Sequence, residues 1–215
     1  MIRIILVDDH AVVRSGYRRL LDHEPGFAVI GEAASADEAY ALVVQQTPDV
    51  AVVDLSLRGS SGLEAIRRIL SRAPQTRILV LSMHEGAGHV TQALRSGALG
   101  YLTKYSEPEC VIEAIRKVAH GQRAFSPEIA QVLADEALAG ERPLADLTPR
   151  EFEVLRLLAH GESALGIAQS MHLSPKTILN YLSLIRQKLD AESDFKLLHL
   201  AARHGLVNLP SPRSC

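Results

Sequence analysis

Carboxylate, hydroxyl and ammonium side chains follow four short apolar runs in the first half of this chain. They are Asp8 and Asp9, Asp54, Ser82, and Thr103 with Lys104. Short aliphatic runs separated by helix-length amphipathic segments are typical of buried parallel strands, and reacting groups in such sheets collect at the carboxyl edge. We therefore expect these side chains to converge. Three carboxylates in one place repel one another unless a cation lies among them, so the pattern predicts a cation site.

An ordinary structural interpretation of these aspartates is that each caps the next helix or turns a loop. That interpretation suits a single strand end. It does not explain why four strand ends together carry carboxylates, a hydroxyl and an ammonium, and we therefore favour a reactive site.

The elements that must position these groups follow from the hydrophobic periodicity. Apolar runs predict five strands, at residues 4–7, 27–33, 50–53, 78–81 and 99–102. Helical spacing of apolar residues predicts helices over His10–His23, Ala36–Gln46, Gly62–Arg72, Gly86–Ser96 and Glu107–Val118. Five successive βα units predict an α/β fold with a doubly wound, five-stranded parallel sheet.

The second half of the chain shows no further strand pattern. A helix is expected over Ser126–Ala139, capped by Ser126 and ended by Gly140 and Arg142. From there on the pattern is helical, and Thr148 with Glu151 forms a capping-box motif. We predict an α/β domain at 1–118, a linker with a helix at 119–145, an all-α domain at 146–209 and a tail at 210–215.

Composition restricts the class of protein. The chain has 215 residues, 47% of them hydrophobic, and a formal net charge of −2, so it can bury a core but is not a generally basic nucleic-acid binder. Cys110 and Cys215 match no metal-ligand spacing and suit reduced thiols. No apolar stretch is long enough to span a membrane, and the first strand leaves no room for a signal peptide. We expect a cytoplasmic protein without a membrane partner.

The strand ends carry residue types at the same sequence spacing as in a known family. The matching residues are Asp8-Asp9, Asp54, Ser82, Tyr101 and Lys104, together with Pro48-Asp49-Val50 and Gly62. The first half thereby resembles the flavodoxin-like receiver domain of two-component response regulators. The resemblance implies that Asp54 is the phosphoacceptor and that Lys104 pairs with a phosphoryl oxygen. It also implies that Ser82 hydrogen-bonds the phosphoryl group and that Tyr101 swings inward behind it.

The same resemblance implies Mg²⁺ as the cofactor. Asp9, Asp54 and the backbone carbonyl of Ser56 would bind the ion directly, and Asp8 would bind it through water. The chemistry agrees independently. A carboxylate that attacks a phosphoryl group needs neutralising charge, which Mg²⁺ and Lys104 supply, and positioning and charge dominate phosphoryl transfer.

A second set of motifs lies between residues 147 and 205. They are Leu147-Thr148-Pro149-Arg150-Glu151, Val154-Leu155, Gly161, Ile167-Ala168, Leu173-Ser174-Pro175-Lys176-Thr177-Ile178, Asn180, Ile185 and Lys188-Leu189. This segment resembles the four-helix DNA-binding domain of the NarL/FixJ type, also called LuxR-type. In such a helix-turn-helix the second helix, here Pro175–Leu189, enters the major groove.

The resemblance also suggests which residues of that helix contact DNA. Leu179, Asn180 and Ser183 stand where the family reads base edges, and Asn prefers adenine. The side chains that suit phosphates are Thr177, Tyr181, Arg186 and Lys188, and Lys176 projects from the same helix. Ile178, Leu182, Ile185 and Leu189 form the core stripe.

This helix and the residues after it depart from the family pattern in ways that reduce the positive charge of the domain. Leu179 stands where Lys is common, Tyr181 where His is common, and Glu192-Ser193-Asp194 is acidic where Arg-rich residues are expected. Each lost cation lowers the affinity for phosphates. An alternative is therefore an output domain that binds DNA weakly or acts through a protein partner.

Together these features predict a response regulator that a sensor histidine kinase phosphorylates on Asp54. Phosphorylation would promote a homodimer that binds double-stranded DNA and regulates transcription, with RNA polymerase as a further candidate partner. The unphosphorylated receiver would cover the recognition helix. We expect no enzyme beyond self-catalysed aspartyl phosphorylation and dephosphorylation. A Mg²⁺-dependent phosphohydrolase is the alternative from another class, but such enzymes commonly carry a second Asp where Ser56 stands.

Overall fold

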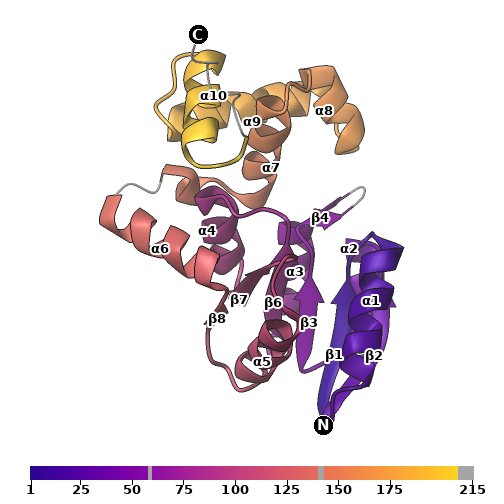
Figure 1. Cartoon of the computed structure of the whole chain (residues 1–215). Coiled ribbons are helices and arrows are strands. Elements are labelled where there is room, and N and C mark those ends of the chain that lie inside the picture. The colour runs from indigo at the N-terminus through magenta and orange to yellow at the C-terminus, as the bar shows by residue number, and fades with distance from the viewer. Residues whose placement is uncertain (58–59, 140–142, 208–215) are drawn as a thin grey trace.

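The computed structural model describes residues 1–57, 60–139 and 143–207. It contains an α/β domain, a linker helix and a C-terminal group of helices (Figure 1). Gly140, Arg142 and the predicted tail at 210–215 lie outside the described residues. In the part of the chain that is described, no helix is both long enough and apolar enough to cross a membrane.

The α/β domain contains one parallel sheet with helices on both faces. Its strands are β1 (Ile2–Val7), β2 (Phe27–Ala33), β3 (Val50–Val53), β6 (Arg77–Ser82), β7 (Ala98–Thr103) and β8 (Ala124–Phe125). They are ordered β2-β1-β3-β6-β7-β8, and all neighbours are parallel. The predicted doubly wound parallel sheet is therefore confirmed. The short strand β8 is an addition that the hydrophobic pattern did not indicate.

Helices cover the two faces of the sheet unequally. They are α1 (Ala11–Asp22), α2 (Ala36–Gln46), α3 (Gly62–Arg72), α4 (Ala87–Arg95) and α5 (Pro108–Ala119). Apolar residues of α1 and α5 pack on one face, and those of α2, α3 and α4 pack on the other. Every one of these helices begins and ends within a single residue of its predicted bounds, because long amphipathic segments leave little freedom in where a helix can lie.

The chain then leaves the sheet through the linker and a small helical domain. Its elements are α6 (Pro127–Ala139), the 3₁₀ turn η1 (Pro143–Asp146), α7 (Pro149–Ala159), α8 (Ala164–Ser170), α9 (Pro175–Lys188) and α10 (Asp194–Arg203). A capped first turn starts each of the last four helices. The predicted capping box is present, since the Thr148 hydroxyl accepts from the Glu151 N–H at 3.3 Å and the Glu151 carboxylate accepts from the Thr148 N–H at 2.7 Å.

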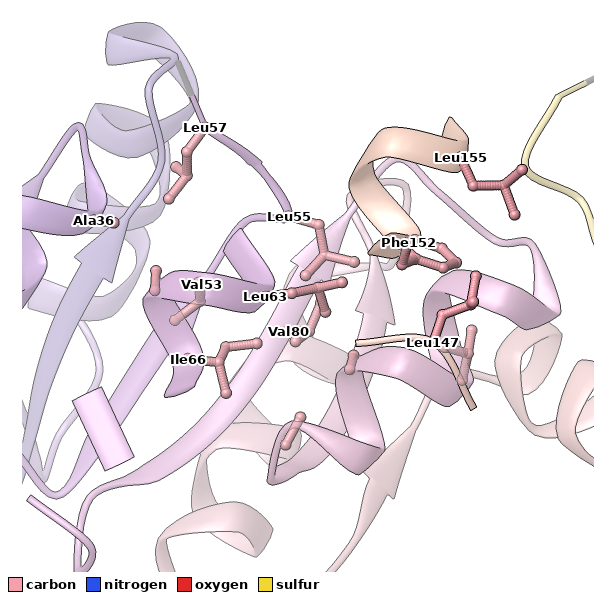
Figure 2. Close-up of a cluster of buried hydrophobic side chains, with 14 of the residues drawn as sticks. Ala36, Val53, Leu55, Leu57, Leu63, Ile66, Val80, Leu147, Phe152 and Leu155 are labelled. Atoms are coloured by element: carbon pink, nitrogen blue, oxygen red, sulfur yellow. The ribbon is translucent and has the colours of Figure 1, made fainter. Parts of the chain in front are cut away.

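The helical domain shares a hydrophobic core with the α2–α4 face of the sheet. Leu147, Phe152 and Leu155 are fully enclosed, as are Leu63 and Val80 of the α/β domain, and all five belong to one cluster. Figure 2 shows the Phe152 ring lying beside Leu55 and Leu63. Burial of such side chains stabilises their contact by about 1.5–3 kcal/mol each, so the two domains are joined by an apolar interface.

Polar contacts tie α4 to the linker and to the turn that follows α10. The Gln92 side chain donates to the backbone carbonyls of Leu144 and Leu147. The Gly88 N–H donates to the His204 carbonyl, just beyond α10, at 3.2 Å. We call this packing of η1, α7 and the turn after α10 on α3 and α4 the closed arrangement.

Two further contacts belong to the closed arrangement. Arg150 of α7 pairs with Glu64 of α3 at 3.0 Å. Gly86, which precedes α4, lies so close to Gly205 that a Cβ atom on Gly86 would be 2.2 Å from the Gly205 carbonyl oxygen. The backbones of the two domains therefore touch, and only glycine fits at residue 86.

Candidate functional site

The predicted strand-end residues meet at the carboxyl edge of the sheet. Asp8 and Asp9 follow β1, Asp54 follows β3 and Lys104 follows β7. The Lys104 Nζ atom lies 2.7 Å from an oxygen of Asp54 and 2.7 Å from an oxygen of Asp8. Asp54 is 3% exposed and Asp8 is 7% exposed. A single ammonium is thus shared between two nearly buried carboxylates.

Burial and the ammonium act against each other on the charges of this site. Burial raises the pKa of the Asp54 carboxyl, and the hydrogen bond from Lys104 opposes that rise. Burial acts to lower the pKa of Lys104, but the hydrogen bonds to Asp54 and Asp8 outweigh it and raise that pKa. Lys104 therefore keeps its positive charge at neutral pH, where it can face an anion.

The same edge has the donor set of a hard divalent cation. Asp8, Asp9, His10 and Asp54 offer ligand atoms that all lie within 4.8 Å of one another. The second oxygen of Asp54, Oδ1, is buried and has no hydrogen-bond partner within the described residues. A buried carboxylate oxygen without a partner is costly, and a cation would satisfy it. The site therefore fits an oxygen-ligated ion such as Mg²⁺.

Ser82 and Tyr101 lie next to each other behind this site. Both are fully buried, on the adjacent strands β6 and β7. The Tyr101 hydroxyl donates to the His84 carbonyl at 2.6 Å, and burial raises the pKa of Tyr101, which stays protonated. The ring is therefore already enclosed, where the resemblance implied a movement inward.

His84 and His10 are site residues that the sequence analysis missed. The Nε2 atom of His84 lies 3.0 Å from the Ser56 hydroxyl oxygen, and the Nδ1 atom of His10 lies 2.8 Å from an oxygen of Asp9. The adjacency of His10 to Asp9 could have drawn attention to it. The contact between His84 and Ser56 spans 28 residues of sequence and had no signal in the pattern.

The predicted DNA-contacting helix is α9, and its faces are arranged as expected. Ile178, Leu182 and Ile185 are buried, whereas Asn180 and Ser183 are exposed. Leu179 is an apolar side chain that is 58% exposed. These three outward residues form a surface that could meet base edges.

Cations of α9 are mostly engaged within their own domain. Arg186 pairs with Asp194 at 2.6 Å, and Lys188 pairs with Glu151 at 2.6 Å. Lys176 is exposed and has no ion-pair partner in the part of the chain that is described. Tyr181 is half-buried and lines a cavity of about 540 Å³ between the domains. The free positive charge on this helix is therefore small.

Comparison with known proteins covers both halves of the chain. Residues 4–116 match the family described as response regulator receiver domain, and residues 145–201 match the luxR family of bacterial regulatory proteins. The response regulator UvrY of Escherichia coli K12 is 37% identical over 211 residues, which is 97% of each chain. The response regulator GacA of Pseudomonas aeruginosa is 36% identical, over 98% of this chain and all of GacA.

Solved structures of response regulators are also similar to this chain. A LuxR-family two-component response regulator from Aurantimonas sp. SI85-9A1 is 48% identical, with a TM-score of 0.62 over 64% of this chain and 99% of that one. RcsB from Salmonella enterica serovar Typhimurium, bound to promoter P1flhDC with the phosphomimetic BeF3⁻, has a TM-score of 0.71. It is 26% identical and covers 94% of this chain and 98% of its own.

Proposed function

Since this chain belongs to the two-component response regulators that carry a LuxR-type DNA-binding domain, we propose that Asp54 is its phosphoacceptor. The observation that carries this proposal is the Lys104 ammonium at 2.7 Å from the Asp54 carboxylate. A carboxylate oxygen of Asp54 bonds to phosphorus while the bond from phosphorus to a histidine of the sensor kinase breaks. Lys104 then pairs with an oxygen of the transferred group.

The residues that would hold Mg²⁺ in this proposal are Asp9, Asp54 and the carbonyl of Ser56, with Asp8 acting through water. When bound, the ion neutralises charge on the phosphoryl oxygens. Ser82 hydrogen-bonds the phosphoryl group, and Tyr101 responds to it on the neighbouring strand. We propose domain boundaries at 1–118, 119–145 and 146–209, with β8 of the middle segment completing the sheet of the first domain.

For the output domain, we propose that α9 reads DNA. Leu179, Asn180 and Ser183 face the base edges, and Lys176 faces phosphate, with Thr177, Tyr181, Arg186 and Lys188 as further contacts. Phosphorylation promotes a homodimer, which places two such helices on one double-stranded site. The setting is the cytoplasm, with the sensor kinase and RNA polymerase as partners.

A regulator that binds DNA only weakly, or acts through a protein partner, is the second candidate. The ion pairs of Arg186 and Lys188 favour it, because a paired cation releases fewer DNA counterions. Steady turnover of a generic phosphatase substrate would instead indicate an enzyme, whereas a regulator forms one acyl phosphate per chain.

Asp54→Asn tests the proposed phosphoacceptor. We expect it to abolish labelling by a small phosphodonor, because Asn keeps the shape of Asp and loses the nucleophilic charge. Mass spectrometry after donor treatment measures the label, and a chelator should prevent labelling of the wild type. Asp49→Asn, a change to another carboxylate at the opposite end of β3, is the matched control and should label normally. Undiminished labelling of Asp54→Asn contradicts the assignment.

A further inference from the structure

His84 lies between the two hydroxyl groups proposed to respond to phosphorylation. Its backbone N–H donates to the Ser82 hydroxyl oxygen at 3.3 Å, and its carbonyl accepts from the Tyr101 hydroxyl at 2.6 Å. Its ring nitrogen Nε2 is 3.0 Å from the Ser56 hydroxyl oxygen. A movement of the Ser82 hydroxyl therefore acts on the His84 N–H, and a movement of the Tyr101 hydroxyl acts on the His84 carbonyl.

The ring of His84 is stacked on the ring of His89 in α4. The ring centroids are 4.3 Å apart, and the planes differ by 4°. His89 is 2% exposed, and neither of its ring nitrogens has a hydrogen-bond partner among the residues described. Burying both nitrogens without partners is unfavourable. When the domains separate, the ring nitrogens of His89 can form hydrogen bonds with water.

The far side of His89 contacts the DNA-binding domain. The His89 ring meets the edge of the Phe152 ring at 5.2 Å between centroids and 88° between planes. Phe152 belongs to α7 and is 1% exposed. The chain of contacts from Ser56 through His84 and His89 to Phe152 thus runs from the acidic site to the other domain (Figure 2 shows Phe152 at this interface).

We propose that the His84–His89 stack couples the state of Asp54 to the closed arrangement. In this proposal, which rests on the proposed function of Asp54, His84 is a positioning residue. When the Ser82 hydroxyl turns to a phosphoryl group on Asp54, the His84 N–H loses its acceptor. His84 then shifts, the stack separates, and α4 loses its hold on Phe152.

The physical basis is that the stack has two states, packed and separated. The acidic site at one end and the contact with Phe152 at the other both shift the equilibrium between them. A parallel stack at 4.3 Å is sensitive to small displacements, because the attraction between rings depends on close contact. The unpartnered nitrogens of His89 disfavour the closed arrangement, so a small loss at the stack is enough to shift the balance toward opening.

The test measures domain separation in the full-length protein. Spin labels on Cys110, which is exposed in α5, and on His199→Cys in α10 report the distance between the domains in a Cys215→Ser background. The ratio of open to closed molecules is compared with and without beryllofluoride and Mg²⁺. In the same samples, ¹⁹F NMR measures the adduct on Asp54.

Two variants should lose the response from opposite starting points. His84→Ala removes the stacking partner of His89. Without beryllofluoride we therefore expect a ratio of open to closed molecules about three- to tenfold higher than in the wild type, which corresponds to the loss of one aromatic pair. His89→Leu keeps apolar contact and removes the unpartnered nitrogens, so it should start more closed by a similar factor. In both, beryllofluoride should change the ratio less than about twofold, against about tenfold in the wild type.

Gln92→Ala is the matched control, since the Gln92 side chain holds the linker from the same helix through the Leu144 and Leu147 carbonyls and is not part of the ring stack. It should start more open and keep the full response to beryllofluoride. A wild-type response in His84→Ala with the adduct formed overturns the coupling. If His84→Ala prevents the adduct, His89→Leu decides, because His89 lies outside the acidic site. Failure of the adduct on the wild type would count against the proposed function and not against the stack.

Discussion

Lysine side chains in this protein differ in role because they face different partners. Lys104 is shared by two nearly buried carboxylates, whereas Lys188 joins α9 to the capping box of α7 through Glu151. Lys176 is exposed at the start of the same helix. The charge of a residue alone therefore does not say whether it binds an anion or stabilises the fold.

Lys188→Ala should destabilise the DNA-binding domain, while Lys176→Ala should not. Glu151 is 4% exposed, and loss of Lys188 leaves its carboxylate with the cap alone, at a cost of about 1–2 kcal/mol. Thermal unfolding of the full chain measures this effect. Lys176→Ala is the control, and it should weaken DNA binding at unchanged stability. Equal stability of the two variants would show that the pair with Glu151 contributes nothing.

Strand-end chemistry was predictable at this scale, and ion pairs between separate helices were not. Asp8, Asp54 and Lys104 follow apolar runs whose order in a parallel sheet forces their ends together. The ion pair between Lys188 and Glu151 depends instead on how two helices cross. Helical spacing specifies which face of each helix is apolar, but not which charged residues meet at the rim.

At the scale of elements, α4 is the part of the receiver that the rest of the chain encloses. Its buried residues run without a break from Gly88 to Ala93, and both sides of the helix have neighbours, since α6 packs beside it (Figure 1). Thr91 donates to the buried Glu136 of α6 at 2.6 Å. Polar residues at these positions look like a solvent-facing side in the sequence, so their burial could not be predicted.

Gly86→Ala should open the closed arrangement without disturbing the receiver itself. Residue 86 has φ −63° and ψ 138°, which any residue adopts, so the only obstacle to a Cβ atom is the Gly205 backbone at 2.2 Å. The spin-label distance should lengthen without beryllofluoride. Gly16→Ala is the control, because nothing lies within 4 Å of the added atom. An unchanged distance in Gly86→Ala would mean that the contact of the two glycines does not hold the domains.

At the scale of the whole molecule, the closed arrangement should depend on pH through His89. Burial lowers the pKa of His89 well below 6.5, helped by His84, Arg156 and His160 nearby; Glu153 lines the cavity beside it. The open form therefore binds more protons, so the stability of the closed form is complete above pH 6.5 and declines as the pH falls.

Lowering the pH from about 7.5 to about 5.5 should therefore increase the open fraction of the wild type. Distance measurements at both values check this, and His89→Leu should respond less. An equal response in both proteins would assign the effect to another titrating group.

DNA binding should depend on two domains acting together. Free cations on α9 are few, so each domain alone is held weakly, and linking two domains can raise affinity by ~10² or more. Phosphorylated full-length protein should bind a selected site much better than the unphosphorylated form. Asn180→Ala should lower affinity for that site by about 1–3 kcal/mol and leave scrambled DNA unaffected. Equal weakening on both DNAs would mean that Asn180 contacts the DNA backbone and not a base.

The strand β8 also determines where this receiver can be shortened. Its pairing of Phe125 with Tyr101 covers the outer side of β7, and the Ser126 N–H continues that cover by donating to the Tyr101 carbonyl. A receiver cut after Val118 would expose a free sheet edge, which recruits strands from other molecules. We expect that fragment to aggregate and one that extends through Ala139 to remain monodisperse.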